Sequence, residues 1–328
     1  MMQPVLQVIN LKKQFNVGAG WFGKAARHVH AIDGVSFELY AGETLSIVGE
    51  SGCGKSTVAR TILGLTELTE GEVHLDGARI DQLSRRALIP LRKRMQVVFQ
   101  DPFSSLNPKM RVRAILAEPL RNFDLVKSEA EIDERVAELM DMVQLSRDGL
   151  SRYPHEFSGG QRQRIGIARA LASRPDVIIC DEAVSALDVS VKAQIVNLLQ
   201  DLQSRLGLAL LFISHDLAIV EHMTHRVAVM YLGKFVEIGT KRQIFGAPQH
   251  PYTQALLSSV PVPEPGAKRT RIVLRGDVPS PINRPPGCHF HKRCIYAFDR
   301  CSTESPVLRS NDEGHWRACH LDAVPKAG

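Results

Sequence analysis

The sequence predicts an α/β fold with a mostly parallel sheet that helices cover on both faces. Apolar, β-branched strand segments alternate with amphipathic helical segments along most of the chain, which is the pattern of repeated βαβ units. A glycine-rich loop stands between one of these strands and the next helix. Polar residues follow several strands at their carboxyl ends, where open α/β sheets bind their ligands.

The N-terminal part contains two expected strands, at residues 5–9 and 35–39. Between them lies an expected loop that contains Trp21 and Phe22. An aromatic side chain in this region either stacks on an adenine ring or packs in a hairpin or core. From the residues alone, both interpretations stay open.

The third expected strand, at residues 44–48, leads into residues 49–57, which match the phosphate-binding pattern G-x-x-x-x-G-K-[ST]. Glycines let the backbone close around phosphates and point N–H groups at the anion, and the helix expected at 58–63 adds its N-terminal partial charge. Lys55 can reach the β- and γ-phosphates, and Ser56 can bind Mg²⁺. The residues expected to contact nucleotide are Gly49, Ser51, Gly52, Cys53, Gly54, Lys55, Ser56 and Thr57.

The cysteine of this loop receives a prediction of its own. Cys53 lies beside Lys55 near an expected helix N-terminus, where thiol pKa values fall. We therefore expect Cys53 to react with maleimides and MgATP to protect it. The alternative is a small buried residue that merely fits the loop.

Further along the chain, strands are expected at 72–77 and 95–99, and the pattern then becomes helical. Ser128 and Glu131 form a capping box ahead of an apolar helical face. We interpret about 101–165 as an inserted helical lobe.

Two more apolar strands, at 176–182 and 208–213, end in polar residues. Asp181 can hold Mg²⁺ through its water shell, and Glu182 is placed to polarise an attacking water. Gln100 can sense both, and His215 can contact the γ-phosphate. Singly, such residues are usually helix caps or structural, but together they supply the positioning and charge neutralisation that phosphoryl transfer requires.

These residues together resemble the motif set of ABC-type ATPases over roughly residues 5–258. The motifs are Walker A (49–56), the Q-loop glutamine Gln100, the signature motif Ser158-Gly159-Gly160-Gln161, Walker B with its glutamate (Asp181, Glu182), the D-loop 185–188 and the H-loop His215. The resemblance implies a P-loop NTPase fold with a mostly parallel core sheet, an N-terminal antiparallel β part and a helical lobe. It also implies a head-to-tail dimer with ATP between the phosphate loop of one subunit and Ser158, Gly159, Gly160, Gln161 and Asp188 of the other.

Two further expectations follow from this resemblance. Phe15 matches the adenine-stacking aromatic of the family better than Trp21 or Phe22 does. The family usually has proline after the catalytic glutamate, whereas this chain has Ala183. Because proline would fix φ, alanine could leave Glu182 less well positioned.

Residues 101–108, DPFSSLNP, and 250–257, HPYTQALL, are similar to the ATP-binding subunits of oligopeptide, dipeptide and nickel importers. This similarity implies ATP hydrolysis that powers peptide uptake across the cytoplasmic membrane. The implied partners are a second, paralogous ATPase chain in a heterodimer, two integral-membrane permeases and, indirectly, a periplasmic or extracellular solute-binding protein, without nucleic acid. Alternatives are a non-peptide solute such as a nickel chelate, or a soluble ABC-type ATPase that acts on nucleic acid or ribosomes.

Composition agrees with a peripheral protein at the cytoplasmic face of the membrane. No apolar run approaches the roughly 20 residues needed to span a bilayer, and the N-terminus lacks a signal-peptide pattern. A half-exporter is disfavoured because it would need fused membrane spans. The net charge of +6 permits a nucleic acid or an anionic membrane surface nearby, but it is modest for 328 residues and favours an ordinary solvated surface.

After about residue 259 prolines become frequent, so we predict a nucleotide-binding domain over 1–258 and a small C-terminal domain over 259–328. Since this tail has few large apolar residues, a metal centre is expected to staple it. The expected ligands of a [4Fe–4S] cluster are Cys288, Cys294, Cys301 and Cys319. Zinc usually takes tighter cysteine spacing, but His289, His291 and His320 keep it as an alternative, and free thiols are a third.

Overall fold

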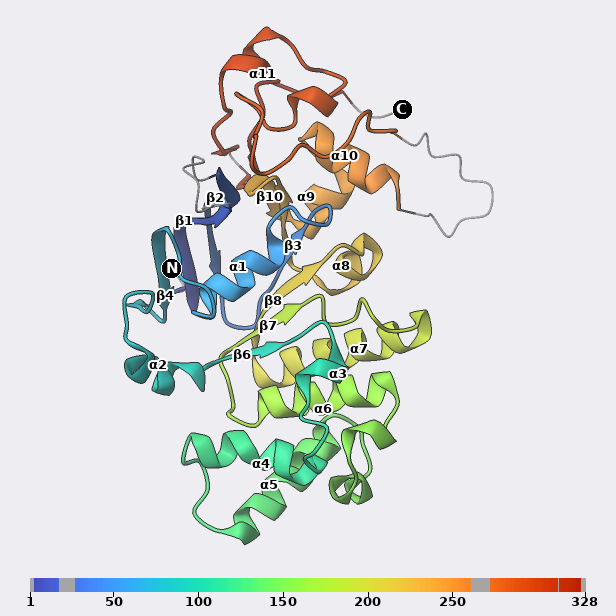
Figure 1. Ribbon diagram of the computed structural model, residues 1–328. Coiled ribbons are helices and arrows are strands. Elements are labelled where there is room, and N and C mark those ends of the chain that lie inside the picture. Colours follow the sequence, from blue (N-terminus) through green and yellow to red (C-terminus); the bar gives the residue numbers. More distant parts are fainter. Residues whose placement is uncertain (1–2, 18–26, 261–271, 312, 326–328) are drawn as a thin grey trace. The chain divides into compact units, whose positions relative to one another are not determined.

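The computed structural model describes residues 3–17, 27–260, 272–311 and 313–325 (Figure 1). Trp21 and Phe22 lie outside these ranges. The described residues form two compact units. The first unit comprises those within 1–7, 38–44 and 74–214, and the second those within 8–37, 45–73 and 215–328. The predicted boundary near residue 259 stays a prediction.

The first unit is built on a parallel sheet of β6 (Met95–Val98), β7 (Val177–Asp181) and β8 (Ala209–Ser214). The register places Asp181 opposite Ile213. All residues of β7 and β8 are buried. This explains why both strands are nearly continuous apolar runs rather than alternating ones, and the predicted parallel sheet is confirmed.

Helices make up most of the rest of the first unit. In chain order they are α2 (Arg85–Arg92), α3 (Pro102–Ser105), α4 (Val112–Asn122), α5 (Glu129–Met142), the 3-10 turns η1 (Arg147–Ser151) and η2 (Pro154–Glu156), α6 (Gly159–Leu171) and α7 (Val189–Leu206). The helices α4, α5 and α6 pack against one another (Figure 1). The residues expected on the apolar face of α5, such as Ile132 and Val136, are buried.

The predicted capping box of α5 is half right. Ser128 Oγ accepts the N–H of Glu131 at 3.2 Å, as expected of an N-cap serine. The Glu131 carboxylate, however, accepts the N–H of Lys127 at 2.8 Å rather than that of Ser128.

The end of β4 (Glu70–Leu75) also belongs to the first unit, where it pairs antiparallel with β5 (Ala78–Arg79).

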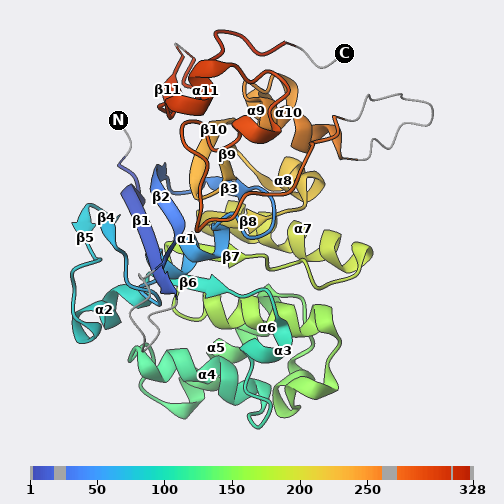
Figure 2. The same ribbon diagram turned by 45° about the horizontal axis from the view of Figure 1, so that its top comes forward.

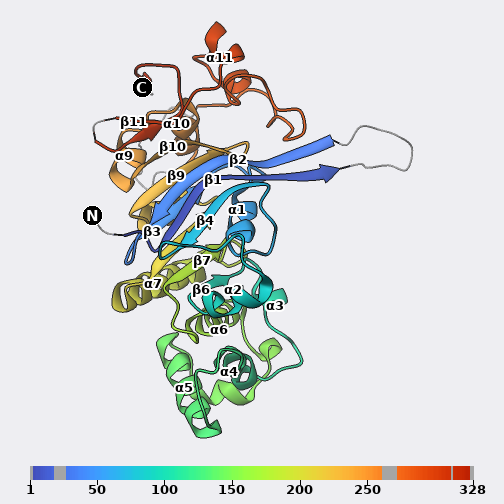
Figure 3. The same ribbon diagram turned by 90° about the vertical axis from the view of Figure 1, so that its left-hand side faces the viewer.

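The second unit contains two sheets. In the N-terminal one, β2 (Arg27–Leu39), β1 (Leu6–Val17) and β4 are neighbours in that order, and Figure 3 shows β1 and β2 as long strands side by side. In the other, β3 (Thr44–Val48) runs parallel to β9 (Arg226–Tyr231). The parallel pair lies beside the helix that follows β3, α1 (Lys55–Ile62).

The second sheet continues into the tail. β10 (Lys234–Thr240) forms a hairpin with β9. It also pairs antiparallel with β12 (Trp316–Arg317), which in turn pairs with β11 (Arg309–Ser310). The remaining helices are α8 (Leu217–Met223), α9 (Lys241–Gly246), α10 (Pro251–Ser258), the 3-10 turn η3 (His291–Arg293) and α11 (Asp299–Thr303). Figure 2 shows α9 and α10 close to β9 and β10.

An aromatic cluster anchors the tail to this sheet. Phe290 is only 2% exposed, and its ring centroid lies 5.2 Å from that of Tyr231 and 5.3 Å from that of Tyr252.

A buried polar network lies near the tail strand β12. The fully buried Glu237 carboxylate accepts the N–H of His250 at 3.0 Å and contacts His315 Nε2 at 2.7 Å.

The expected [4Fe–4S] cluster is wrong. Across the described residues, which include Cys288, Cys294, Cys301 and Cys319, no group of three or more His, Cys, Asp or Glu side chains is arranged to hold a metal ion. The zinc alternative fails on the same ground, and these cysteines are free thiols. Burial raises the pKa of the Cys288 and Cys294 thiols to about 11. The aromatic cluster and β12 supply the anchorage that the sequence argument assigned to a metal.

We predict that Phe290→Ala destabilises the protein by about 3 to 5 kcal/mol, the usual cost of truncating a buried aromatic side chain. Urea unfolding of the full chain measures the effect. Phe298→Ala is the matched control: this side chain is 44% exposed, so its loss should cost less than about 1 kcal/mol. Equal losses from the two variants would contradict an anchoring role for Phe290.

Candidate nucleotide-binding site

The phosphate loop has the predicted strand–loop–helix context. β3 ends at Val48 and α1 begins at Lys55. Gly54 caps α1 with a φ of 112°, and a Cβ atom there would lie 2.2 Å from the carbonyl oxygen of Ala31. A Cβ on Gly49 would lie 2.1 Å from the carbonyl oxygen of Met230. Both ends of the loop therefore require glycine, because neighbouring backbone occupies the space of any side chain.

Lys55 lies within the loop rather than in solvent. Its side chain is 4% exposed, and its Nζ donates to the carbonyl oxygens of Gly49 at 2.8 Å and Glu50 at 3.0 Å. The ammonium group thus joins the two ends of the loop. It puts a positive charge where the sequence predicts a polyphosphate.

Neighbouring segments of the second unit hold the loop in place, and the sequence analysis missed these contacts. The N–H of Glu50 donates to Tyr252 Oη at 2.9 Å, and the carbonyl of Cys53 accepts the N–H of Gly233 at 2.9 Å. The Glu50 carboxylate accepts two hydrogen bonds from the guanidinium of Arg293. Tyr252 lies in the HPYTQALL segment, whose sequence indicates the family but not this contact, and nothing in the sequence indicates Arg293.

In the first unit, Asp181 and Glu182 lie at the carboxyl end of β7. Asp181 is 7% exposed. Glu182 has a φ of 50°, an uncommon conformation for a residue with a side chain, of the kind that clusters at functional sites. Hydrogen bonds hold it there: its N–H donates to Ile213 at 3.0 Å, and its carbonyl accepts the N–H and hydroxyl of Ser185 at 3.0 and 2.8 Å.

Gln100 comes two residues after the end of β6 and is exposed. Since β6 and β7 are parallel neighbours, Gln100 follows the same edge of the sheet at which Asp181 lies. Gln163 donates to the carbonyl of Phe99 at 3.4 Å, which supports the chain as it leaves β6. His215 directly follows Ser214, the last residue of β8, and belongs to the second unit.

The signature residues begin α6. Ser158 Oγ accepts the N–H of Gln161 at 3.3 Å, while Gln161 Oε1 accepts the N–H of Ser158 at 2.9 Å, a reciprocal capping box. A Cβ on Gly160 would lie 2.4 Å from Val191, so the helix start packs closely on α7. Asp188 is the exposed N-cap residue of α7. The 13-residue helix has no acid in its first turn, so its N-terminal partial positive charge is available to an anion.

Comparison with known families agrees with this geometry. Residues 32–185 match the family model described as ABC transporter, and residues 236–301 match that of the oligopeptide/dipeptide transporter, C-terminal region. The probable peptide ABC transporter ATP-binding protein y4tS of Sinorhizobium fredii is 52% identical over 327 residues, which cover 100% of this chain and 92% of that protein. This chain belongs to the family of peptide ABC transporter ATP-binding proteins.

Other members and solved structures support the same assignment. The oligopeptide transport ATP-binding protein AppF of Bacillus subtilis is 50% identical over 97% of this chain and 98% of its own length. Among solved structures, the ATP-binding cassette MJ0796 bound to ADP and Pi is 29% identical, with a TM-score of 0.64 over 72% of this chain and 99% of that one. As a member of this family, the chain is an ABC-type ATPase that couples hydrolysis to transport.

The family usually has proline where this ABC-type ATPase has Ala183. None of the three hydrogen bonds that fix Glu182 involves residue 183, and the Ala183 side chain is 1% exposed. Hydrogen bonds therefore fix the backbone just after β7, where the family usually has the rigid backbone of proline.

Phe15, the expected adenine-stacking residue, lies on β1. Its ring is 39% exposed, and the Lys13 ammonium lies 4.9 Å from the ring centroid. An exposed aromatic face next to a cation is suited to stacking on a base that carries phosphates.

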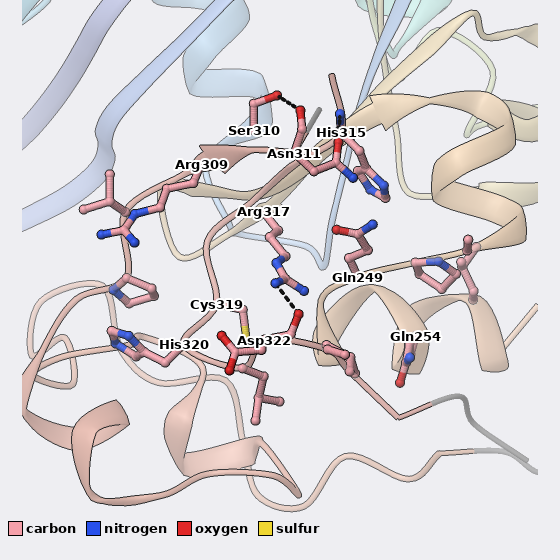
Figure 4. Close-up of a pocket in the computed structure, with 18 of the residues that line it drawn as sticks. Gln249, Gln254, Arg309, Ser310, Asn311, His315, Arg317, Cys319, His320 and Asp322 are labelled. Atoms are coloured by element: carbon pink, nitrogen blue, oxygen red, sulfur yellow. Dashed lines mark hydrogen bonds between the residues drawn. The ribbon is translucent and has the colours of Figure 1, made fainter. Parts of the chain in front are cut away.

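A cavity of about 980 Å³ lies in the C-terminal part of the second unit (Figure 4). Its lining comes from residues 245–258 and 300–324. Arg317 donates to the carbonyl of Asp322 within it. None of its lining residues is among those that the sequence predicts to contact nucleotide. Elsewhere in the described ranges, no helix has the length and apolarity to cross a membrane.

The lowered thiol pKa that the sequence predicts for Cys53 is not found in the structure. Cys53 is 4% exposed, and burial raises the pKa of its thiol despite the opposing influence of the Lys55 charge. Desolvation, which the local sequence does not reveal, favours the protonated thiol and outweighs the nearby cation.

We therefore predict that Cys53 of the folded protein reacts with maleimide at least about tenfold more slowly near pH 7.5 than in urea, because only the thiolate is a good nucleophile. Its labelling should accelerate as pH rises toward the elevated pKa. Mass spectrometry of the labelled peptides measures both. Cys180, whose pKa burial raises to about 12, is the internal control and should also be protected. Equal labelling of Cys53 in folded and unfolded chains would refute this.

Proposed function

We propose that this chain binds MgATP at the phosphate loop and hydrolyses it to drive the import of peptides through membrane permeases. One observation carries the peptide assignment. The C-terminal region, which matches the oligopeptide/dipeptide transporter family, is in direct contact with the phosphate loop through Tyr252 and Arg293. The names of y4tS and AppF, a peptide and an oligopeptide transporter protein, support the same substrate class.

Each predicted site residue has a role in this proposal. Lys55 neutralises phosphate charge, and Phe15 stacks on the adenine. Glu182 polarises the attacking water, assisted by Gln100 and His215. The other expected nucleotide contacts are Gly49, Ser51, Gly52, Cys53, Gly54, Ser56 and Thr57 on one subunit and Ser158, Gly159, Gly160, Gln161 and Asp188 on the other.

The residues proposed for magnesium offer the chemistry that this ion prefers. Ser56 contributes a hydroxyl, Asp181 a carboxylate and Gln100 an amide oxygen, all hard oxygen donors. When bound, Mg²⁺ neutralises charge on the phosphates. Asp181 ends β7, so its carboxylate is at the carboxyl end of a sheet strand, where open α/β sheets bind their ligands.

We propose that the chain works as a heterodimer with a paralogous ATPase at the cytoplasmic face of the membrane. Closure of the ATPase dimer on ATP drives two integral-membrane permeases, and a solute-binding protein supplies the peptide to them. The proposed organisation is a nucleotide-binding domain at 1–258, with its helical lobe at about 101–165, and a C-terminal domain at 259–328.

The hydrolytic roles predict different defects for two variants of the assembled transporter. Glu182→Gln should bind ATP normally but lower kcat by about 10²- to 10⁴-fold, the range for losing a general base. Lys55→Ala should weaken ATP binding itself, because a phosphate-neutralising charge is lost. Nucleotide titration and phosphate release measure the two effects. Glu134→Gln, an exposed glutamate on α5, is the control. Near wild-type hydrolysis by Glu182→Gln would contradict the assignment.

The transport role predicts that cells without this chain lose uptake of labelled di- and tripeptides, and that the wild-type chain restores it while Glu182→Gln does not. Uptake of a nickel chelate in the same cells tests the non-peptide alternative. Affinity purification should recover two integral membrane proteins and a second ATPase chain. Recovery of ribosomes or nucleic acid instead would contradict a transporter, and two copies of this chain without a paralogue would contradict the heterodimer.

A further inference from the structure

We infer that Arg293 is a positioning residue for the phosphate loop: its guanidinium neutralises the Glu50 carboxylate and so makes the loop receptive to the phosphates of ATP. Arg293 ends the 3-10 turn η3 in the C-terminal segment. It lies 243 residues from Glu50 in sequence, yet both belong to the second unit.

Arg293 and Glu50 form a bidentate ion pair. Arg293 Nη1 donates to Glu50 Oε2 at 2.7 Å, and Nη2 donates to Oε1 at 3.1 Å. The Arg293 side chain is 8% exposed and that of Glu50 is 26% exposed, so the pair is shielded from solvent. Paired, charge-assisted hydrogen bonds of this kind fix orientation as well as charge.

The charges of the phosphate-loop residues explain why the loop needs Arg293. Residues 49–57 contain one acid, Glu50, and one base, Lys55, so the loop itself carries no net charge. The Lys55 ammonium is bonded to the backbone carbonyl of Glu50, so Glu50 belongs to the part of the loop that this charge contacts. An unpaired carboxylate there would repel ATP. The Arg293 guanidinium makes the set of three charges net positive.

The surroundings of Arg293 hold it in place for this task. Its guanidinium lies 5.9 Å from the ring centroid of Tyr231, which in turn packs on Phe290 and Tyr252. Tyr252 also accepts the N–H of Glu50. The C-terminal part of the chain therefore fixes both the backbone and the side chain of Glu50.

A second ion pair ties the same tail down at a different point. Arg284 donates to the Asp33 carboxylate on β2, and Lys234 Nζ lies 3.4 Å from it. Nearby, the N–H of His30 donates to the carbonyl of Pro281 at 3.2 Å. Arg284 attaches the tail without contacting Glu50, so it offers a matched comparison for Arg293.

The test is a double-mutant cycle on the full chain, with MgATP affinity measured by titration. Arg293→Gln should weaken binding by at least about tenfold, because truncating one partner of a shielded charge pair leaves the other charge unpaired. In a Glu50→Gln background the same change should cost less than about twofold, because no carboxylate remains to be neutralised. In the assembled transporter, Arg293→Gln should raise KM for MgATP and leave kcat nearly unchanged. An equal loss in both backgrounds would overturn the inference.

Three controls separate neutralisation from simple support of the fold. Arg284→Gln should leave MgATP affinity unchanged, and Arg293→Lys, which keeps the charge, should recover most of the affinity. The deficit of Arg293→Gln relative to wild type should shrink in high salt, because salt screens the repulsion. Glu50→Gln alone needs no change at Arg293 and should bind MgATP at least as tightly as wild type. Tenfold weaker binding by Glu50→Gln, or a Lys variant as weak as the Gln variant, would also overturn the inference.

Discussion

The close approach of backbone to backbone around the phosphate loop is the constraint on which the site depends. The carbonyls of Ala31 and Met230 lie where a side chain of Gly54 or Gly49 would have to be. β3 delivers the chain into this space, and α1 begins as soon as the chain leaves it. Lys55 then turns back onto the loop, so its charge and the helix N-terminus serve the same small region.

The C-terminal segment is part of the support of this loop and not an appendage. Phe290 packs against both Tyr231 and Tyr252, and β12 extends the sheet from β10. The expectation of a metal staple treated the proline-rich tail as a chain that must offset its own conformational entropy. Its buried surface is instead provided by residues far away in sequence, which is why composition gave the wrong answer.

Glu182 illustrates how hydrogen bonding can replace a stiff residue. Its left-handed backbone is fixed by the carbonyl of Ile213 and by the backbone and hydroxyl of Ser185. A strained conformation persists only where its surroundings impose it. The alanine that follows is thus compatible with a well-placed Glu182.

By itself, the sequence determined the elements whose causes are local or strongly periodic: the apolar strands β7 and β8, the face of α5, and the glycine loop between β3 and α1. Its motifs also identified the family, since their order along the chain is specific. Only the tertiary structure decided the state of Cys53, the fate of the four tail cysteines and the pairing of Arg293 with Glu50. Those depend on burial and on contacts between residues up to 243 positions apart, and neither quantity is contained in local pattern or spacing.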